Sequence, residues 1–305
     1  MRCLLIAPNS VNVDVLSGVL VDQGVEVLST SELGAGVILA QAPADLADCA
    51  VAVLPSQSAG TAEGLAAVFI EIGVVVGREI PILVVVEPPD APPPALAGAT
   101  VVRALANNVD ALRLHIRMFM LSIAASDAAQ RPTPPAALEP SSLAGFRARL
   151  EAIRNPPQRP RSSGGGMVSI RGWQLLQLVY DVLSSAGAVV AAEVELSSEP
   201  RRDADAVAYI PGTESVLGAI IVEVKLRRFT EADLRNAEQQ LLANMKVGRV
   251  SFGLLVYDGL ATSANKFRTI PFVLALSIDE LLSELEYMPL GEMLVRARNR
   301  AVHGV

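Results

Sequence analysis

The first 125 residues alternate short, continuously apolar runs with longer stretches of helical periodicity. The apolar runs lie at 2–8, 25–29, 50–55, 80–87 and 100–104. Four helices are expected between and after them: one that begins near Asp14, one that ends near Asp48, one over 64–77 and one over 108–124. Strands that are apolar on both faces and separated by helices are typical of a parallel sheet covered on both sides. We therefore predict a doubly wound α/β domain, flavodoxin- or Rossmann-like, for residues 1–125.

The last part of the chain, residues 167–305, shows a different order of patterns. A helix over "IRGWQLLQLVYDVLSSAG" precedes strands over "AVVAAEVEL", "DAVAYIPG" and "GAIIVEVKL", and then come a helix over "TEADLRNAEQQLLANMKVG" and a strand over "VSFGLLVYDG". The loop "IPGTESVLG" carries glycine towards both ends, which favours a hairpin and antiparallel pairing of the second and third strands. Roughly two helices follow the last expected strand. This order predicts a second α/β domain.

Between these halves, residues 126–166 are rich in Pro, Ser, Gly and Arg, with one short helical stretch around "LAGFRARLEAIR". Such composition is typical of an interdomain linker. Six arginines gather in and just after it: Arg147, Arg149, Arg154, Arg159, Arg161 and Arg171. They could contact nucleic-acid phosphates, and a solvated linker is the alternative.

Composition narrows the class of protein. With 305 residues, 51% hydrophobic and 19% charged, the chain can build two globular cores. No apolar run approaches the ~20 residues of a membrane helix, and the amino terminus has the pattern of a strand and turn instead of a signal peptide. Cys3 and Cys49 lie in apolar stretches without metal-ligand spacing, which indicates core thiols in a reducing compartment. We expect a cytoplasmic protein that does not contact membranes.

A pair of opposite charges interrupts the apolar stretch "GAIIVEVKLRR" at 218–228. Because side chains alternate along a strand, Glu223 and Lys225 share one face. If this strand pairs with the preceding one as a hairpin, Asp205 approaches both. One or two carboxylates together with phosphate oxygens make a sufficient magnesium site, and the metal lowers the pKa of a bound water. A charge pair on an exposed edge strand is the alternative interpretation.

With these residues and this element order, the segment 168–260 resembles the PD-(D/E)XK nucleases, the restriction-endonuclease-like superfamily that includes Mrr-type enzymes. The resemblance implies Asp205 and Glu223 as metal ligands, with the carbonyl of Val224 as a possible third. It implies Lys225 as the residue that positions water or stabilises charge. The helix-borne accessory residue would be Gln240.

The same resemblance implies a magnesium- or manganese-dependent DNA endonuclease, acting as a homodimer that cuts both strands. Asp203 and Gln239 are nearby competitors for the assigned positions, and Asn244 stands where the family often has a tyrosine. A catalytically inactive member of the fold is the alternative.

A carboxylate also interrupts an apolar helix of the first half, at Glu71 in "IEIGVVVG". The stretch is similar to TIR-like and nucleoside deoxyribosyltransferase-like domains, in which a glutamate faces a nucleotide ribose. The resemblance implies a nucleotide pocket formed by Glu71, Gly60, Thr61 and the loop at Asn9. An ion pair between Glu71 and Arg78 is the alternative. Neither a GxGxxG nor a Walker motif is present.

Together these two resemblances imply a prokaryotic restriction or antiviral defence nuclease gated by a nucleotide at its first domain. The alternative is a nucleotide-binding or NAD-processing TIR-like protein whose second half is an inactive interaction module. Arg298 and His303 resemble the R-x4-H signature of HEPN ribonucleases, but a basic helix end is the favoured interpretation.

Overall fold

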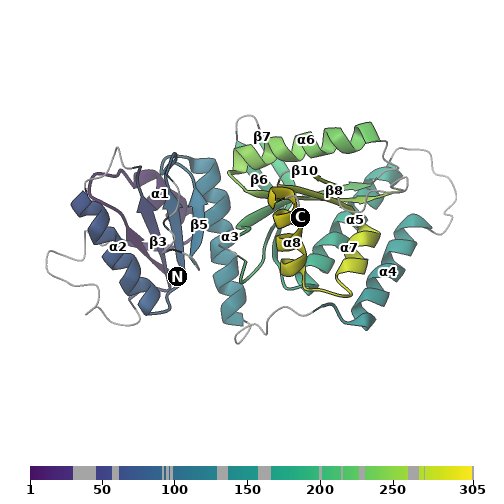
Figure 1. Cartoon of the computed structure of the whole chain (residues 1–305), viewed down its shortest axis with the longest axis horizontal. Helices are drawn as coiled ribbons and strands as arrows, with labels where there is room; N and C mark the ends of the chain where they lie inside the picture. Colours follow the sequence, from purple (N-terminus) through teal and green to yellow (C-terminus); the bar gives the residue numbers. More distant parts are fainter. Residues whose placement is uncertain are drawn as a thin grey trace. The chain divides into compact units, whose positions relative to one another are not determined.

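The computed structural model describes residues 1–29, 46–56, 62–90, 93, 96, 99–128, 137–156, 166–198, 201–213, 216–226, 231–259, 268–270 and 272–303. The chain divides into two compact units, Met1–Ala124 and Ala125–Val305 (Figure 1). In the described parts of both units, no helix has the length and apolar character needed to cross a membrane.

The first unit is built on a five-stranded sheet with the order β2-β1-β3-β4-β5, in which every neighbouring pair is parallel. Its elements are β1 (Arg2–Ile6), α1 (Asp14–Asp22), β2 (Glu26–Ser29), β3 (Cys49–Leu54), α2 (Ala62–Gly77), β4 (Ile82–Val86), β5 (Thr100–Arg103) and α3 (Val109–Ala128). The predicted doubly wound α/β fold is confirmed. The helix expected to end near Asp48 falls mainly on residues outside the described ones, and residues 46–48 are not helical.

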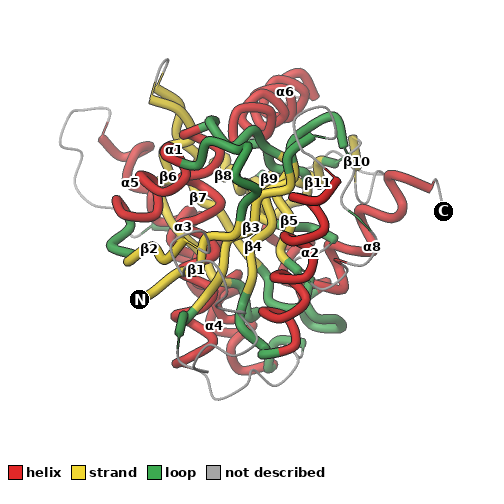
Figure 2. The backbone as a smooth tube through the Cα atoms, turned by 90° about the vertical axis from the view of Figure 1, so that its left-hand side faces the viewer, coloured by secondary structure: helices red, strands yellow, loops and turns green. Residues whose placement is uncertain are grey.

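Both faces of this sheet are buried, which explains its continuously apolar strands. Cys3 and Leu5 pack with α1 and α3, whereas Leu4 and Ile6 pack with α2. Figure 2 shows α2 on one side of β3 and β4, and α1 and α3 on the other. Cys3 and Cys49 are fully buried register partners on β1 and β3. A hydrogen bond with Cys49 and burial raise the pKa of the Cys3 thiol well above its usual range, so it remains un-ionised.

The second unit contains a six-stranded mixed sheet with the order β10-β11-β9-β8-β7-β6. Its elements are α4 (Pro140–Arg154), α5 (Gly166–Ser185), β6 (Val189–Ser198), β7 (Arg201–Tyr209), β8 (Ala219–Leu226), α6 (Glu231–Gly248), β9 (Phe252–Asp258), β10 (Arg268–Ile270), β11 (Val273–Ser277), α7 (Ile278–Glu284) and α8 (Leu290–His303). The predicted helix, three strands, helix and strand are all present, and β7 and β8 are antiparallel as expected. The sequence interpretation missed β10 and β11.

Strand β8 lies inside this sheet, between antiparallel β7 and parallel β9. Helix α6 covers one face, and α4, α5 and α7 cover the other (Figure 1). Residues 219–223 of β8 are all buried. A charged residue at 219–223 of β8 therefore faces either the α6 side or the α5 side of the sheet, with little access to solvent.

Helix α4 corrects the prediction that 126–166 is simply a linker. Its apolar residues Leu143, Phe146, Leu150 and Ile153 are buried in the core of the second unit. Two of its arginines reach carboxylates elsewhere in that unit: Arg147 pairs with Glu286 at 2.7 Å and Arg149 with Asp181 at 2.8 Å. Arg147 and Arg149 of the predicted basic cluster thus have structural partners, while Arg159 and Arg161 lie outside the described residues.

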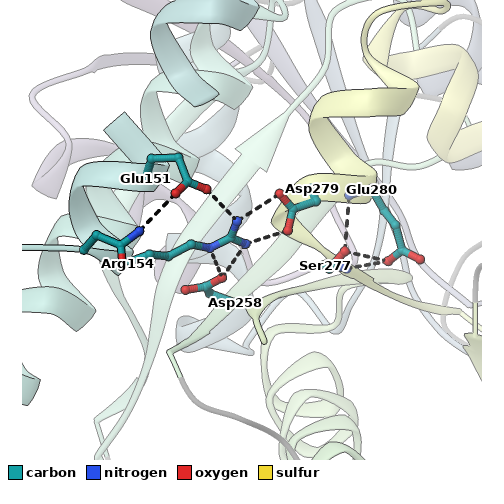
Figure 3. Close-up of polar contacts among 7 residues, drawn as sticks. Glu151, Arg154, Asp258, Ser277, Asp279 and Glu280 are labelled. Carbon is teal, nitrogen blue, oxygen red and sulfur yellow. Dashed lines mark hydrogen bonds and ion pairs between the residues drawn. The ribbon is translucent and has the colours of Figure 1, made fainter. Parts of the chain in front are cut away.

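The last residue of α4, Arg154, connects three elements (Figure 3). Its Nε and Nη2 donate to Oδ1 of Asp258, at the end of β9, at 2.9 and 2.7 Å. Its Nη2 and Nη1 donate to the two oxygens of Asp279 in α7 at 2.5 and 3.2 Å. Hydrogen bonding to Asp279, followed by the contacts with Asp258, raises the pKa of the Arg154 guanidinium. This network fixes α4 against the carboxyl end of β9 and the start of α7.

Candidate active site

The candidate site begins where β7 and β8 stop pairing. The last register pair of these strands is Ala206 with Val222, although β8 continues beside β9 as far as Leu226. Beyond that pair, the side chain of Asp205 takes the place of a main-chain carbonyl as the hydrogen-bond acceptor for β8: its Oδ2 accepts from the N–H of Val224 at 2.8 Å. The divergence of the two strands thus leaves Asp205 beside the main chain of β8.

Glu223 lies at the centre of the cluster and is only 2% exposed. Its Oε1 accepts a hydrogen bond from Nδ2 of Asn244 in α6 at 2.8 Å, and its Oε2 accepts one from Nζ of Lys225 at 3.0 Å. The alternation along β8 directs Glu223 and Lys225 towards α6, while Val222 and Val224 pack in the core on the opposite face. The contact of Glu223 with Asn244 comes from a helix that begins eight residues later in the chain, at Glu231.

The electrostatics of Glu223 show that two carboxylates share the site. Burial, and then repulsion by the charge of Asp205, raise the pKa of Glu223. Attraction by Lys225 and hydrogen bonds from Lys225 and Asn244 act in the opposite direction. The favourable contacts with Lys225 and Asn244 therefore do not fully offset the cost of burying a charge beside Asp205. Carboxylates with a pKa raised in this way are enriched at functional sites.

An open pocket of about 330 Å³ adjoins the cluster at the carboxyl end of β8. Lys225 and Gln240 both line it, and its other lining residues are Val224, Leu226, Asp233, Asn236 and Ala237. Gln240 is exposed, and Asn244 lies one turn further along α6. Lys225 therefore joins the pocket to the buried Glu223.

Among the predicted site residues, the structure brings together Asp205, Glu223, Val224 and Lys225, and Gln240 lines the same pocket as Lys225. The competitor Asp203 is exposed and lies in register with Glu195 of β6, whereas Asp205 contacts the main chain of β8. Gln239 is exposed as well. The contact of Asn244 with Glu223 was not predicted from the sequence. The signal that could have predicted it is the position of Asn244 four residues after Gln240, on the same face of the helix.

The donor set of the cluster fits a hard divalent cation. Within the described residues, no three His, Cys, Asp or Glu side chains gather as a metal site. The oxygens available are the carboxylates of Asp205 and Glu223 and the carbonyl of Val224, which points to the same side of β8 as the N–H that Asp205 accepts. Magnesium and manganese prefer such oxygens, and a cation between two carboxylates would relieve the repulsion that raises the pKa of Glu223.

The residues predicted for a nucleotide pocket are not assembled in the same way. Asn9 is exposed and follows β1, at the carboxyl edge where the strand order reverses between β1 and β3. Gly60 and Thr61 lie outside the described residues. Glu71 is half-buried and lies nine residues after Ala62, the first residue of α2. At ~1.5 Å per residue, this places Glu71 about 14 Å along the helix from its start. The structure therefore places Glu71 well away from the edge that carries Asn9.

Two further residues noted in the sequence lie in helices. His115 is buried in α3, between Leu114 and Ile116. Arg298 lies in α8, and its Nη1 is 3.5 Å from Oδ1 of Asn299. The side chain of His303, the last residue of α8, is outside the described part.

Comparisons with known proteins add little to this geometry. No family model matches the chain, and no curated protein matches it. One solved structure with a similar portion is a refined half-complex from the tetradecameric assembly of Thermococcus gammatolerans McrB AAA+ hexamers with bound McrC. The match has 10% identity and a TM-score of 0.29, and it covers 44% of this chain and 33% of the other. The chain thus spans about a third of the length of that protein, and the similarity is too low to support an argument.

Proposed function

We propose that the second unit is a metal-dependent nuclease that hydrolyses phosphodiester bonds of DNA. The observation that carries the proposal is the hydrogen bond from Val224 N–H to Asp205, because it brings a second carboxylate beside Glu223 and Lys225. Two carboxylates and a lysine beside an open pocket are a suitable set for attack of water on a phosphodiester.

Each residue has a distinct role in the proposed reaction. Asp205, Glu223 and the carbonyl of Val224 would hold Mg²⁺ or Mn²⁺, which when bound neutralises phosphate charge and lowers the pKa of water. Lys225 is 29% exposed and lines the pocket, so its ammonium can orient the attacking water or stabilise charge on the phosphate. Gln240, which lines the same pocket from α6, could hydrogen-bond the substrate.

The wider biological setting is also proposed. DNA is the substrate suggested by the resemblance to restriction-type nucleases, and a homodimer would allow both strands to be cut. A small nucleotide at the edge of the first unit near Asn9 would gate the activity in a defence or restriction system. The reduced, buried thiols of Cys3 and Cys49 support a cytoplasmic location.

The test is cleavage of supercoiled plasmid by the purified full chain, with Mg²⁺, with Mn²⁺ and with a chelator. The comparison is between wild type and Glu223→Ala, with and without a panel of small nucleotides. The proposal predicts metal-dependent nicking that Glu223→Ala abolishes. Cleavage that survives in Glu223→Ala, or in chelator, would assign the activity to another site or to a contaminant. No cleavage under any condition would favour the inactive nuclease-like module.

A further inference from the structure

Asn244 is a buried polar residue that the proposed reaction does not use directly. It is 4% exposed, lies in the fourth turn of α6, and is one of the few buried polar side chains of the second unit. Its amide donates to Oε1 of Glu223 at 2.8 Å. Lys225 occupies the other oxygen of the same carboxylate. Each oxygen of Glu223 therefore has its own donor.

We propose that Asn244 is the positioning residue of the site: by donating to Oε1, it fixes the rotation of the Glu223 carboxylate and thus the orientation in which that carboxylate would meet the cation. The inference rests on the proposed function only for the cation, because the orientation of Glu223 is a property of the metal-free protein. Without this donor, Lys225 would be the remaining hydrogen-bonding restraint on the last torsion of the buried carboxylate among the described residues.

The chemistry of an amide suits this position. Its N–H₂ group donates to an ionised carboxylate, whereas its oxygen can accept from a protonated one. Asn244 can therefore remain hydrogen-bonded to Glu223 in either protonation state. Asn244 is also neutral, and it therefore adds no repulsion to a site that already holds Asp205.

The surroundings of Glu223 identify the other groups that could alter its titration. Asp205 faces it from β7, and Lys225 lies on β8 itself. On β9 its register partner is the apolar Leu255. From α6 it meets Asn244, whereas the buried Glu238 of that helix acts on Tyr257. Asn244 is thus the neutral hydrogen-bonding partner whose removal changes no charge.

The experiment measures two properties of the metal-free full chain: the carboxyl-carbon NMR signal of Glu223 at a single pH, identified by its loss in Glu223→Gln, and the calorimetric affinity for Mn²⁺. Three variants are compared with wild type. Asn244→Leu removes the amide at similar size. Asn244→His restores a donor nitrogen the same number of bonds from Cα. Gln239→Leu is a control for an exposed change on the same helix.

We expect Asn244→Leu to shift the carboxyl signal of Glu223 and to weaken Mn²⁺ binding by roughly tenfold or more, by analogy with residues that orient metal ligands. Asn244→His should recover most of both, and Gln239→Leu should match wild type. An unchanged Glu223 signal or an unchanged Mn²⁺ affinity in Asn244→Leu would overturn the inference. So would changes that Asn244→His fails to restore.

If Asn244→Leu does not fold, Asn244→Ala takes its place, since it removes the amide without adding a branched side chain. Neither measurement needs turnover, so this result is separate from the nuclease assay. A protein with the expected Glu223 signals and Mn²⁺ affinities that cleaves no DNA would support the role of Asn244 and contradict the proposed function.

Discussion

Two charged clusters lie at the carboxyl ends of neighbouring strands in the second unit, on opposite faces of one sheet. Lys225 and Glu223 face α6, whereas Asp258 of β9 faces Arg154 of α4. Leu226 and Asp258 are register partners, so the two clusters are separated by little more than the thickness of the sheet. Their electrostatics differ. Hydrogen bonds to carboxylates favour the charged form of Arg154, while burial and Asp205 disfavour the charged form of Glu223.

The difference indicates which cluster stabilises the fold and which is available for chemistry. Arg154 joins α4, β9 and α7 with bidentate geometry, an arrangement that removes freedom from all three elements. Glu223 and Asp205 bring like charges together beside an open pocket, an arrangement that lowers stability unless a cation is added. Similar residue types at the same sheet edge thus take opposite roles.

The largest effect is expected from Lys225→Met, which keeps the length of the side chain and removes its charge. If Lys225 orients water or stabilises the phosphate, the single-turnover cleavage rate should fall by about 10²- to 10⁴-fold. The plasmid assay at saturating Mg²⁺ measures it. Arg154→Met, assayed well below its melting temperature, is the matched control and should cleave at nearly the wild-type rate. A loss below tenfold in Lys225→Met would remove that residue from the mechanism.

Arg154→Met should produce the largest change in stability. Asp258 has a side chain only 12% exposed, and loss of the guanidinium leaves it without this donor. We expect the free energy of unfolding to fall by about 2–3 kcal/mol, measured by urea denaturation. The double variant Arg154→Met/Asp258→Asn should recover part of the loss because it removes the buried charge. Equal stabilities of wild type and Arg154→Met would contradict a structural role for the network.

Glu223→Gln should have the opposite effect in the metal-free protein. The pKa of Glu223 is raised on folding, so the native state retains a proton that the unfolded chain has lost. Wild-type stability therefore falls as pH rises from the ordinary glutamate pKa through the folded value. At pH 7 the melting temperature of Glu223→Gln should exceed that of wild type, with each kcal/mol worth about 2–4 °C, and the difference should vanish below about pH 4. A variant less stable than wild type at pH 7 would show that Glu223 is fully compensated.

The smallest effect is expected at the exposed ion pair of α4. The side chains of Arg147 and Glu286 are 48% and 38% exposed, so solvent screens their attraction. Arg147→Ala should lower stability by less than ~1 kcal/mol in the same denaturation experiment. A loss of stability comparable to that of Arg154→Met would contradict this expectation. It would mean that the exposed pair stabilises α4 as much as the Arg154 network does.

The features of the fold and the site that could be predicted from the sequence depend on local periodicity. Alternation along "GAIIVEVKL" was enough to put Glu223 and Lys225 on one face, and the glycines of the loop "IPGTESVLG" before it were enough to pair β7 with β8. With that pairing, Asp205 could be assigned to the cluster. The hydrogen bond to Val224 follows from the divergence of the strands, which no local pattern encodes.

The features that sequence reasoning missed depend on packing between distant segments. The apolar spacing of Leu143, Phe146, Leu150 and Ile153 was visible, but the proline- and glycine-rich flanks made α4 resemble part of a linker. Its place in the core is set by contacts with residues far along the chain, such as Asp258 and Asp279. Likewise, the pairing of Asn244 with Glu223 depends on how α6 lies on the sheet.

The most direct test is calorimetric titration of the metal-free chain with Mn²⁺, because the proposed reaction requires Asp205 and Glu223 to hold a divalent cation. Wild type is compared with Asp205→Asn, in the candidate site, and Asp258→Asn, the matched change in the Arg154 cluster. We predict one bound cation in wild type and Asp258→Asn, and at least roughly tenfold weaker binding in Asp205→Asn. Equal affinities in wild type and Asp205→Asn, or loss of binding only in Asp258→Asn, would contradict the central claim.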